Sequence, residues 1–377
     1  MNNSFIHRFL NKMNIKQYLT NIPGWHTNRK IVVIESDDWG SIRMPSKKVY
    51  DYLLKKGYRV NERPYERYDS LENDKDLESL FEVLTSVRDI NNHHAIITAN
   101  SVVANPDFIK IKKSHFQEYY YELFFETFSK YNHSGAFELW QEGLNKGFFI
   151  PQFHGREHFN IPVWMRALRE KNKDVQIAFD LGMAGIFPKE HPEKGNEYSI
   201  AYLFETHEDV ILHQLSISEG LDLFEQIWGY KSETFIAPGY TWSRKNEYIL
   251  NIQKIKLVQG MNYQFEPQND NGKKKIFHFS GEKNNFGQRY NVRNCFFEPT
   301  LNPNLDWVDT CLNQIQIAFR CKKPAIICSH RLNYIGNIDT RNRDGNLVKL
   351  KNLLMCIQKK WPDVEFVSSD KLIEIMT

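Results

Sequence analysis

Two pairs of residues in this sequence could hold a metal ion and use it for hydrolysis. Asp37 and Asp38 follow the apolar run 31–34, and His154 and His158 begin just past another apolar stretch. On a helical turn, histidines at i and i+4 lie on one face, about 5–6 Å apart at Cβ. Two neutral imidazoles with one carboxylate suit zinc or a similar first-row ion and leave a position open for water. The pattern predicts a catalytic divalent metal site and metal-assisted hydrolysis.

Each pair alone has an ordinary explanation. An Asp-Asp pair at a strand end is often a turn former, and a chain with 13 histidines contains His-x-x-x-His pairs by chance. Both pairs, however, follow strand-like runs, and α/β enzymes keep their chemistry at the carboxyl ends of strands. The two pairs therefore support each other as parts of one site.

The elements that would position these residues are strands alternating with helices, which indicates parallel strands joined by crossover helices. Strands are expected at 31–36, 95–100, 148–153, 176–180, 233–237, 256–259, 325–329 and 364–367. Helices are expected at 47–56, 75–88, 135–146, 162–171, 218–228, 243–253, 305–320 and 345–360. Repeated units of this number favour a barrel or a doubly wound sheet.

The length of 377 residues fits one decorated domain better than two. We expect that domain at 28–377, an N-terminal extension at 1–27, and insertions near 105–134 and 264–293. The aromatic residues of the first insertion are expected to pack in the core or a lid rather than to stack on a sugar. The second is rich in Asn, Gly and Lys and is expected near the site.

Composition excludes several classes of protein. The net charge of +3 gives no electrostatic reason to bind nucleic acid or an anionic membrane. Five cysteines without a C-x-x-C pair indicate reduced thiols rather than a disulfide framework. No apolar stretch approaches the length of a signal-peptide core or a membrane span. We therefore expect a cytoplasmic protein without a membrane span; the oligomeric state is not indicated.

Four motifs in order along the chain resemble those of the polysaccharide deacetylases of carbohydrate esterase family 4. They are Ser36-Asp37-Asp38, His154-x-x-x-His158, the segment Phe235 to Tyr240, and Cys328-Ser329-His330. The resemblance covers about 28–377, and the first two motifs are its specific part. It implies an irregular (β/α)7 barrel with insertions.

The resemblance also implies roles for particular residues. Asp38, His154 and His158 would ligate the metal, most consistent with Zn²⁺. Asp37 would be the general base, and His330 the general acid that protonates the leaving group. The backbone N–H of Tyr240 would hold the oxyanion beside the metal.

The sequence departs from the family at the arginine that pairs with the base. That arginine is expected near Ile236, which cannot pair with a carboxylate. Arg156, Arg293 and Arg331 are candidates to replace it, and Arg156 is the best placed because it lies within the histidine motif.

Further residues near the motifs are candidates for substrate contact or for orienting the site. Trp39 follows the two aspartates and could stack on a sugar or pack in the core. Asn100 ends a predicted strand and could orient a site residue or form a turn.

The function implied is a metal-dependent hydrolase that removes an N- or O-acyl group from a carbohydrate. Two alternatives stay open. The missing arginine motivates a non-catalytic, metal-retaining carbohydrate-binding barrel, and such barrels also host hydrolases of other non-peptide C–N bonds. A nucleotide-binding protein has no support, because no phosphate-binding glycine motif follows a predicted strand.

Overall fold

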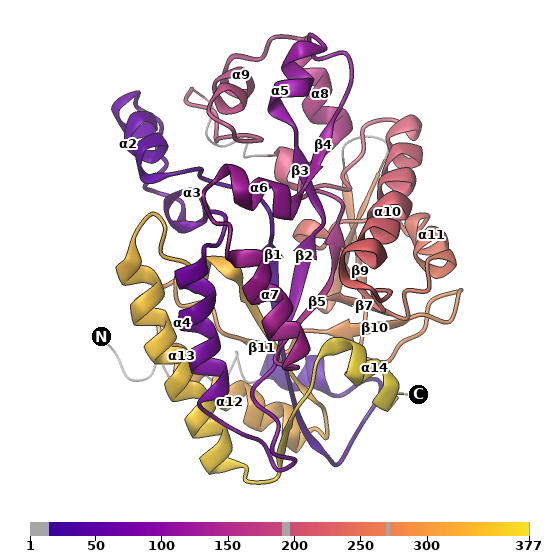
Figure 1. Cartoon of the computed structure of the whole chain (residues 1–377). Coiled ribbons are helices and arrows are strands. Elements are labelled where there is room, and N and C mark those ends of the chain that lie inside the picture. Colours follow the sequence, from indigo (N-terminus) through magenta and orange to yellow (C-terminus); the bar gives the residue numbers. More distant parts are fainter. Residues whose placement is uncertain (1–14, 191–196, 269–271, 377) are drawn as a thin grey trace, which may run out of the picture.

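A curled, mainly parallel sheet forms the centre of the computed structural model, which describes residues 15–190, 197–268 and 272–376 (Figure 1). Its strands lie in the order β10-β7-β6-β5-β2-β1-β12-β11, and β13 also pairs with β1. Their bounds are β1 (Lys30–Trp39), β2 (Ile97–Val102), β5 (Phe149–Gly155), β6 (Thr234–Ile236), β7 (Leu257–Gly260), β10 (Arg289–Val292), β11 (Cys295–Phe296), β12 (Ala325–His330) and β13 (Val364–Phe366).

Residues 31–34 of strand β1 are all apolar, and both faces of the strand are buried there. Val32 and Ile34 belong to the main core, whereas Ile31 and Val33 pack on the opposite face against α14 (Ser369–Met376). Strands covered on both faces read as continuous apolar runs, and this run is what made β1 recognisable in the sequence.

One extended segment joins the two edges of the sheet. β10 pairs with β7 and β11 pairs with β12, and two residues separate them. The N–H of Arg293 donates to Gly260 of β7, and the N–H of Asn294 donates to Ile326 of β12. The chain thus crosses from one edge to the other between these residues. If β10 and β11 count as one strand, the path contains seven, which confirms the predicted irregular (β/α)7 barrel class.

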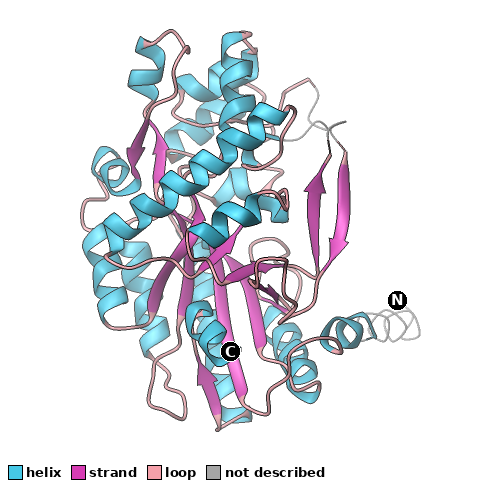
Figure 2. Cartoon of the chain, turned by 90° about the vertical axis from the view of Figure 1, so that its right-hand side faces the viewer, coloured by secondary structure: helices cyan, strands magenta, loops and turns pink. Residues whose placement is uncertain are grey.

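Helices surround the sheet. Figure 2, viewed from the side, shows the strands running through the body with most helices above them and along one side. Their bounds are α2 (Lys47–Lys55), α3 (Pro64–Tyr68), α4 (Asp74–Thr85), α5 (Phe108–Lys113), α6 (Phe124–Lys130), α7 (Ala136–Asn145), α8 (Ile161–Arg169), α9 (Lys173–Asp180), α10 (His207–Trp228), α11 (Asn246–Ile252), α12 (Trp307–Arg320) and α13 (Thr340–Lys360). None of the helices described is both long and apolar enough to cross a membrane.

The predicted strand 176–180 is wrong, because these residues lie in α9. The Asn172 side chain accepts hydrogen bonds from the N–H groups of Asp174 and Val175 and so caps the helix. Val175, Ala178 and Phe179 are buried at the i, i+3, i+4 spacing of a helix. A short apolar run is compatible with the periodicity of a strand or of a helix. The N-cap at Asn172 shows that this run forms a helix.

The two predicted insertions contain short antiparallel pairs. β3 (Ala104–Pro106) pairs with β4 (Tyr121–Leu123), and β8 (Tyr263–Pro267) pairs with β9 (Lys273–Phe277). Residues 289–292 of the second predicted insertion belong to the barrel, as β10, and 269–271 lie outside the described residues. So do residues 1–14 of the predicted extension, while Trp25 and Thr27 donate backbone hydrogen bonds to Ser280 and Lys322 of the body.

One end of the barrel carries additional structure. Figure 1 shows α2, α3, α5, α8 and α9 gathered beyond that end of the strands, and we call these helices and their connecting segments the cap. Ile42, Met183 and Ala184 of this region face the same cavity as Asp38 and His154. The cap therefore covers the carboxyl ends of β1 and β5.

Candidate metal centre

A bulge at the end of β1 lets two consecutive aspartates reach the same side. Neighbouring strand residues normally point to opposite faces. The register between β1 and β2 shifts between Ser36 and Trp39, and Asp38 adopts a left-handed backbone with φ of 75°. Aspartate tolerates this conformation better than most residues. Both Asp37 and Asp38 consequently line one cavity.

His154 lies in β5, and its ring orientation is fixed by the backbone of β6. Nδ1 of His154 is 2.9 Å from the carbonyl oxygen of Ile236. A carbonyl only accepts, so Nδ1 carries the proton, and in the neutral ring Nε2 is a bare lone pair. Ile236 thus orients a site residue through its backbone, although its side chain is apolar.

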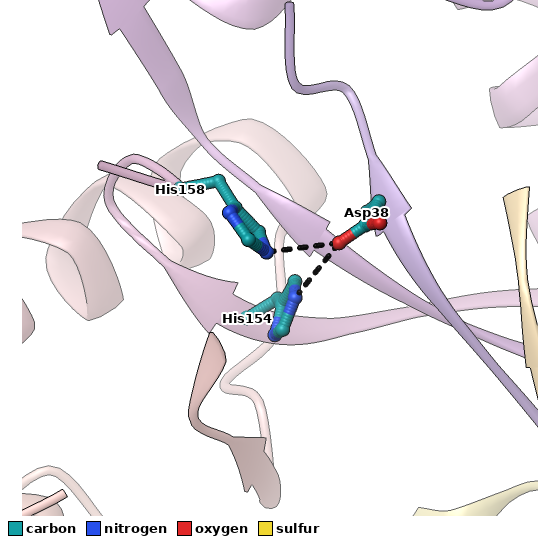
Figure 3. A group of neighbouring side chains, drawn as sticks. All are labelled: Asp38, His154 and His158. Atoms are coloured by element: carbon teal, nitrogen blue, oxygen red, sulfur yellow. Dashed lines mark ion pairs between the residues drawn. The ribbon is translucent and has the colours of Figure 1, made fainter. Parts of the chain in front are cut away.

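His158 reaches the site from the loop after β5, not from a helical turn as the spacing suggested. Gly155 makes the turn with φ of 126°, and a Cβ there would lie 2.9 Å from the Tyr202 hydroxyl. The two imidazole centroids are 5.0 Å apart. Figure 3 shows both rings directed at the Asp38 carboxylate.

The three side chains fit a metal ion. Their ligand atoms lie within 4.8 Å of one another, and all three residues are buried. Nε2 of His154 has no hydrogen-bond partner and lies 3.4 Å from Oδ1 of Asp38. In a neutral ring this places two electron-rich acceptors face to face in a buried site, which a cation between them would stabilise.

Arg43 contacts both His158 and Asp38 and so affects how His158 could bind a metal. Its Nη2 lies 3.2 Å from Nδ1 of His158 and 3.6 Å from Oδ2 of Asp38. Burial and the adjacent Arg43 lower the pKa of His158 to about 4, so the ring is neutral at pH 7, as a ligand requires. With Arg43 donating to Nδ1, the ring proton is on Nε2, which is 2.9 Å from Asp38. Ligation through Nε2 therefore requires the proton to move to Nδ1 and Arg43 to turn away.

Asp37 is held by a buried arginine, and that arginine is Arg293 rather than Arg156. Nη1 and Nη2 of Arg293 donate to the two Asp37 oxygens at 2.6 and 2.7 Å. Asn100 donates to Oδ1 of Asp37 at 2.8 Å, so it orients a residue of the candidate site, which was one of its two expected roles. Burial alone would raise the pKa of Asp37, but Arg293 lowers it to about 2. Asp37 is thus ionised at neutral pH.

His330 faces Asp37 and is paired with a carboxylate that the sequence analysis missed. Its Nδ1 lies 2.6 Å from Oε1 of Glu298, and its Nε2 lies 3.8 Å from Oδ2 of Asp37. Asn333 donates to the other Glu298 oxygen at 2.7 Å. Burial would lower the pKa of His330, but Glu298 outweighs it and raises that pKa to about 9. His330 is therefore protonated at neutral pH, as a general acid must be.

Three other predicted contacts lie elsewhere. Trp39 is 1 % exposed and packs edge-on against Trp140 and Phe149, so it is a core residue and not at a rim. Arg156 pairs with Glu157 and Glu219 beside a neighbouring cavity. Arg331 is fully buried; it pairs with two acids, Asp69 and Glu72, and links them to β12. Both arginines are thus paired with acids other than Asp37, which the sequence spacing could not reveal.

Tyr240 lines the cavity, but its backbone N–H already has a partner. That N–H donates to the carbonyl of Ala237 at 3.0 Å, within the turn η3 (Pro238–Tyr240). The predicted oxyanion donor is therefore occupied. Arg43, which the sequence analysis did not single out, is a cationic donor in the same cavity.

If His330 is the general acid that the resemblance implies, kcat/KM for hydrolysis should fall above about pH 9, because an acid must be protonated to act and the folded pKa of His330 lies there. Glu298→Gln removes the charge that raises this pKa, so the alkaline limb should move to lower pH. A pH profile of kcat/KM from about pH 6 to pH 10 measures this. Glu78→Gln, an exposed carboxylate on α4, is the control and should leave the limb in place. An unshifted limb in Glu298→Gln would contradict the assignment.

Comparison of the sequence with protein-family models and with curated proteins found no match. Solved structures with a similar chain path include a "putative polysaccharide deacetylase" from Mycobacterium smegmatis, with 9 % identity, 94 % of this chain and 92 % of that chain covered, and a TM-score of 0.46. A "putative glycoside hydrolase/deacetylase" from Parabacteroides distasonis has 9 % identity, coverage of 94 % and 72 %, and a TM-score of 0.49. The Puue allantoinase has 10 % identity, coverage of 95 % and 94 %, and a TM-score of 0.46. All three TM-scores are below 0.5, so these likenesses identify neither the family nor the activity of this chain.

Proposed function

We propose that this protein is a metal-dependent hydrolase that removes an N- or O-acyl group from a carbohydrate. The observation that carries the proposal is the buried Nε2 of His154, which has no hydrogen-bond partner and faces Asp38, with Asp37 and His330 on the same cavity. A divalent metal bound there, with Zn²⁺ favoured by the ligand types, would lower the pKa of a bound water and polarise the acyl oxygen.

The protein's own residues would move the protons. Asp37, kept ionised by Arg293, takes a proton from the attacking water. His330, kept protonated by Glu298, donates from Nε2 to the leaving nitrogen or oxygen. The positive Arg293 keeps Asp37 deprotonated and the negative Glu298 keeps His330 protonated, so one group can act as the base and the other as the acid.

The arginine missing at position 236 does not favour a non-catalytic barrel. Arg293 supplies the same charge from β10–β11, and it contacts both oxygens of Asp37. The missing arginine is the only reason for the non-catalytic alternative, and Arg293, from another element, removes that reason.

Metal content tests the proposal first. We expect about one equivalent of zinc or another first-row metal in the purified protein, and its loss in His154→Ala and in His158→Ala. His93→Ala, at an exposed histidine paired with Asp89, is the matched control and should keep the metal. Elemental mass spectrometry on all four proteins gives the answer, and failure to bind after reconstitution would overturn the proposal.

A further inference from the structure

The cavity at the candidate metal centre has charged residues on the barrel side and a mainly apolar wall on the cap side, which also carries Arg43, Tyr65 and Glu66. Its volume is about 360 Å³. The barrel contributes the aspartates and histidines described above. Apolar side chains make up most of the cap's contribution to the wall, namely Ile42, Met44, Phe159, Met183, Ala184, Phe187 and Ile200.

The apolar wall is part of a packed core and not a loose crevice. Met44 and Met183 belong to a cluster that includes Leu53 of α2 and Ala178 of α9. The backbone N–H of Phe187 donates to the Glu66 carboxylate at 3.0 Å, which ties this segment to α3. Preformed apolar sites of this kind bind ligands without first having to order themselves.

The cavity is buried around the candidate metal centre and open to solvent elsewhere, where Gly239 is exposed. Ile42, Met44 and Met183 on the cap side are 1–4 % exposed, and Asp37 and Asp38 on the barrel side are both 3 % exposed. The group that reaches the buried part of the cavity, next to Asp37 and Asp38, must therefore be small or terminal.

The acyl part of an acylated sugar fits this wall better than the sugar ring does. A sugar ring carries a hydroxyl on most of its carbons, and Ile42, Met183 and Ala184 offer those hydroxyls no hydrogen-bond partner. A hydroxyl buried against them would lose its hydrogen bonds to water without replacing them. A methylene chain binds there more tightly as it lengthens, because each buried methylene raises the affinity about fourfold.

Resting on the proposed function, we propose that the cavity takes the acyl group of the substrate, a straight chain longer than acetyl, while the sugar stays at the mouth. The carbonyl lies beside Asp38, and the chain covers the apolar side chains of the cap, among them Met44, Met183 and Ala184. The site therefore selects longer acyl chains over acetyl.

A homologous substrate series tests this in the wild-type protein. We expect kcat/KM for N-acyl glucosamines to rise by about fourfold per methylene from acetyl through butanoyl to hexanoyl, and to stop rising near octanoyl, when the wall is covered. Values that stay flat or fall from acetyl onwards would overturn the acyl site.

Binding without turnover separates this inference from the proposed function. Isothermal calorimetry with the same series on Asp37→Asn should show Kd falling with chain length. If the wild type hydrolyses none of the series but Kd still falls, the hydrolase proposal fails and the acyl site stands. If acetyl glucosamine is hydrolysed and neither Kd nor kcat/KM depends on chain length, the acyl site fails alone.

A pair of matched substitutions places the chain. Ala184→Leu narrows the cavity at its apolar wall, and we expect it to lower the ratio of octanoyl to acetyl kcat/KM at least tenfold. Ala201→Leu makes the same change at a buried alanine that lines the neighbouring cavity, and should leave the ratio unchanged. Thermal unfolding and metal content show whether both variants are folded, and the substrate series on the wild type decides the question if either is not. Equal ratios in the two variants would overturn the placement.

Discussion

We expect Asp37→Asn to lower kcat by about 10²–10⁴-fold, the usual contribution of a general base, while the metal stays bound. The amide keeps the size of the carboxylate and can still accept from Arg293, which remains paired with Glu35. It cannot take a proton from water at neutral pH. Single-turnover rates with an acylated amino sugar, measured beside metal content, give the result.

The neighbouring residue is the matched control for this prediction. Asp38→Asn should lose the metal, because Asp38 and not Asp37 lies within 3.4 Å of both imidazole Nε2 atoms. Asp37→Asn should therefore lose activity and keep the metal, whereas Asp38→Asn should lose the metal itself. If Asp37→Asn also lost the metal, or kept full activity, its assignment as the base would be wrong.

The residues that lie at the ends of strands could be predicted because their positions follow from local patterns. An apolar run such as 31–34 marks a strand buried on both faces, and polar residues after it mark the carboxyl end. Asp37, Asp38, His154 and His330 all follow such runs, and the structure brings all four to one cavity.

The partners of these residues could not be predicted, since each contact depends on closure of the barrel. Arg293 is far from Asp37 in sequence, and it meets the base because the chain crosses between the two sheet edges at that residue. Glu298 follows two residues after β11 and reaches His330 for the same reason. Arg156 was preferred because it was close in sequence, but that loop turns it towards Glu157.

A signal for Arg293 was nevertheless present in the sequence. The stretch Arg289 to Phe297 alternates polar and apolar residues at its start and ends in an apolar run, which is typical of a strand. Its first part, 289–293, falls in the predicted insertion 264–293, because Asn, Gly and Lys dominate the residues before it. Ending the insertion before 289 would have placed an arginine at the end of a strand, in the position where a base needs a partner.

We expect Arg293→Met to destabilise the protein by about 3–5 kcal/mol at pH 7, because removing one partner of a buried ion pair leaves uncompensated charge. Arg293 is 1 % exposed and its Nε lies 2.7 Å from Glu35, so two buried carboxylates lose their cation at once. Chemical denaturation followed by circular dichroism measures the change. Arg289→Met, on the same strand, removes one hydrogen bond to the Gly281 carbonyl and is the control, with an expected cost of about 1 kcal/mol or less.

The loss in Arg293→Met should shrink as the pH falls. In the wild type, Asp37 has a folded pKa of about 2, below its unfolded value, so the stability it contributes is present above the unfolded pKa and lost as the pH falls towards 2. In the variant, burial without Arg293 raises the folded pKa of Asp37 above its unfolded value, and it raises further the pKa of Glu35, which burial already elevates in the wild type. The variant therefore regains stability as these groups take up protons. Its free energy of unfolding should lie closer to that of the wild type at about pH 4 than at pH 7. A gap that stays constant with pH would mean that Arg293 stabilises the barrel by packing alone, and not as the charge partner of Asp37 and Glu35.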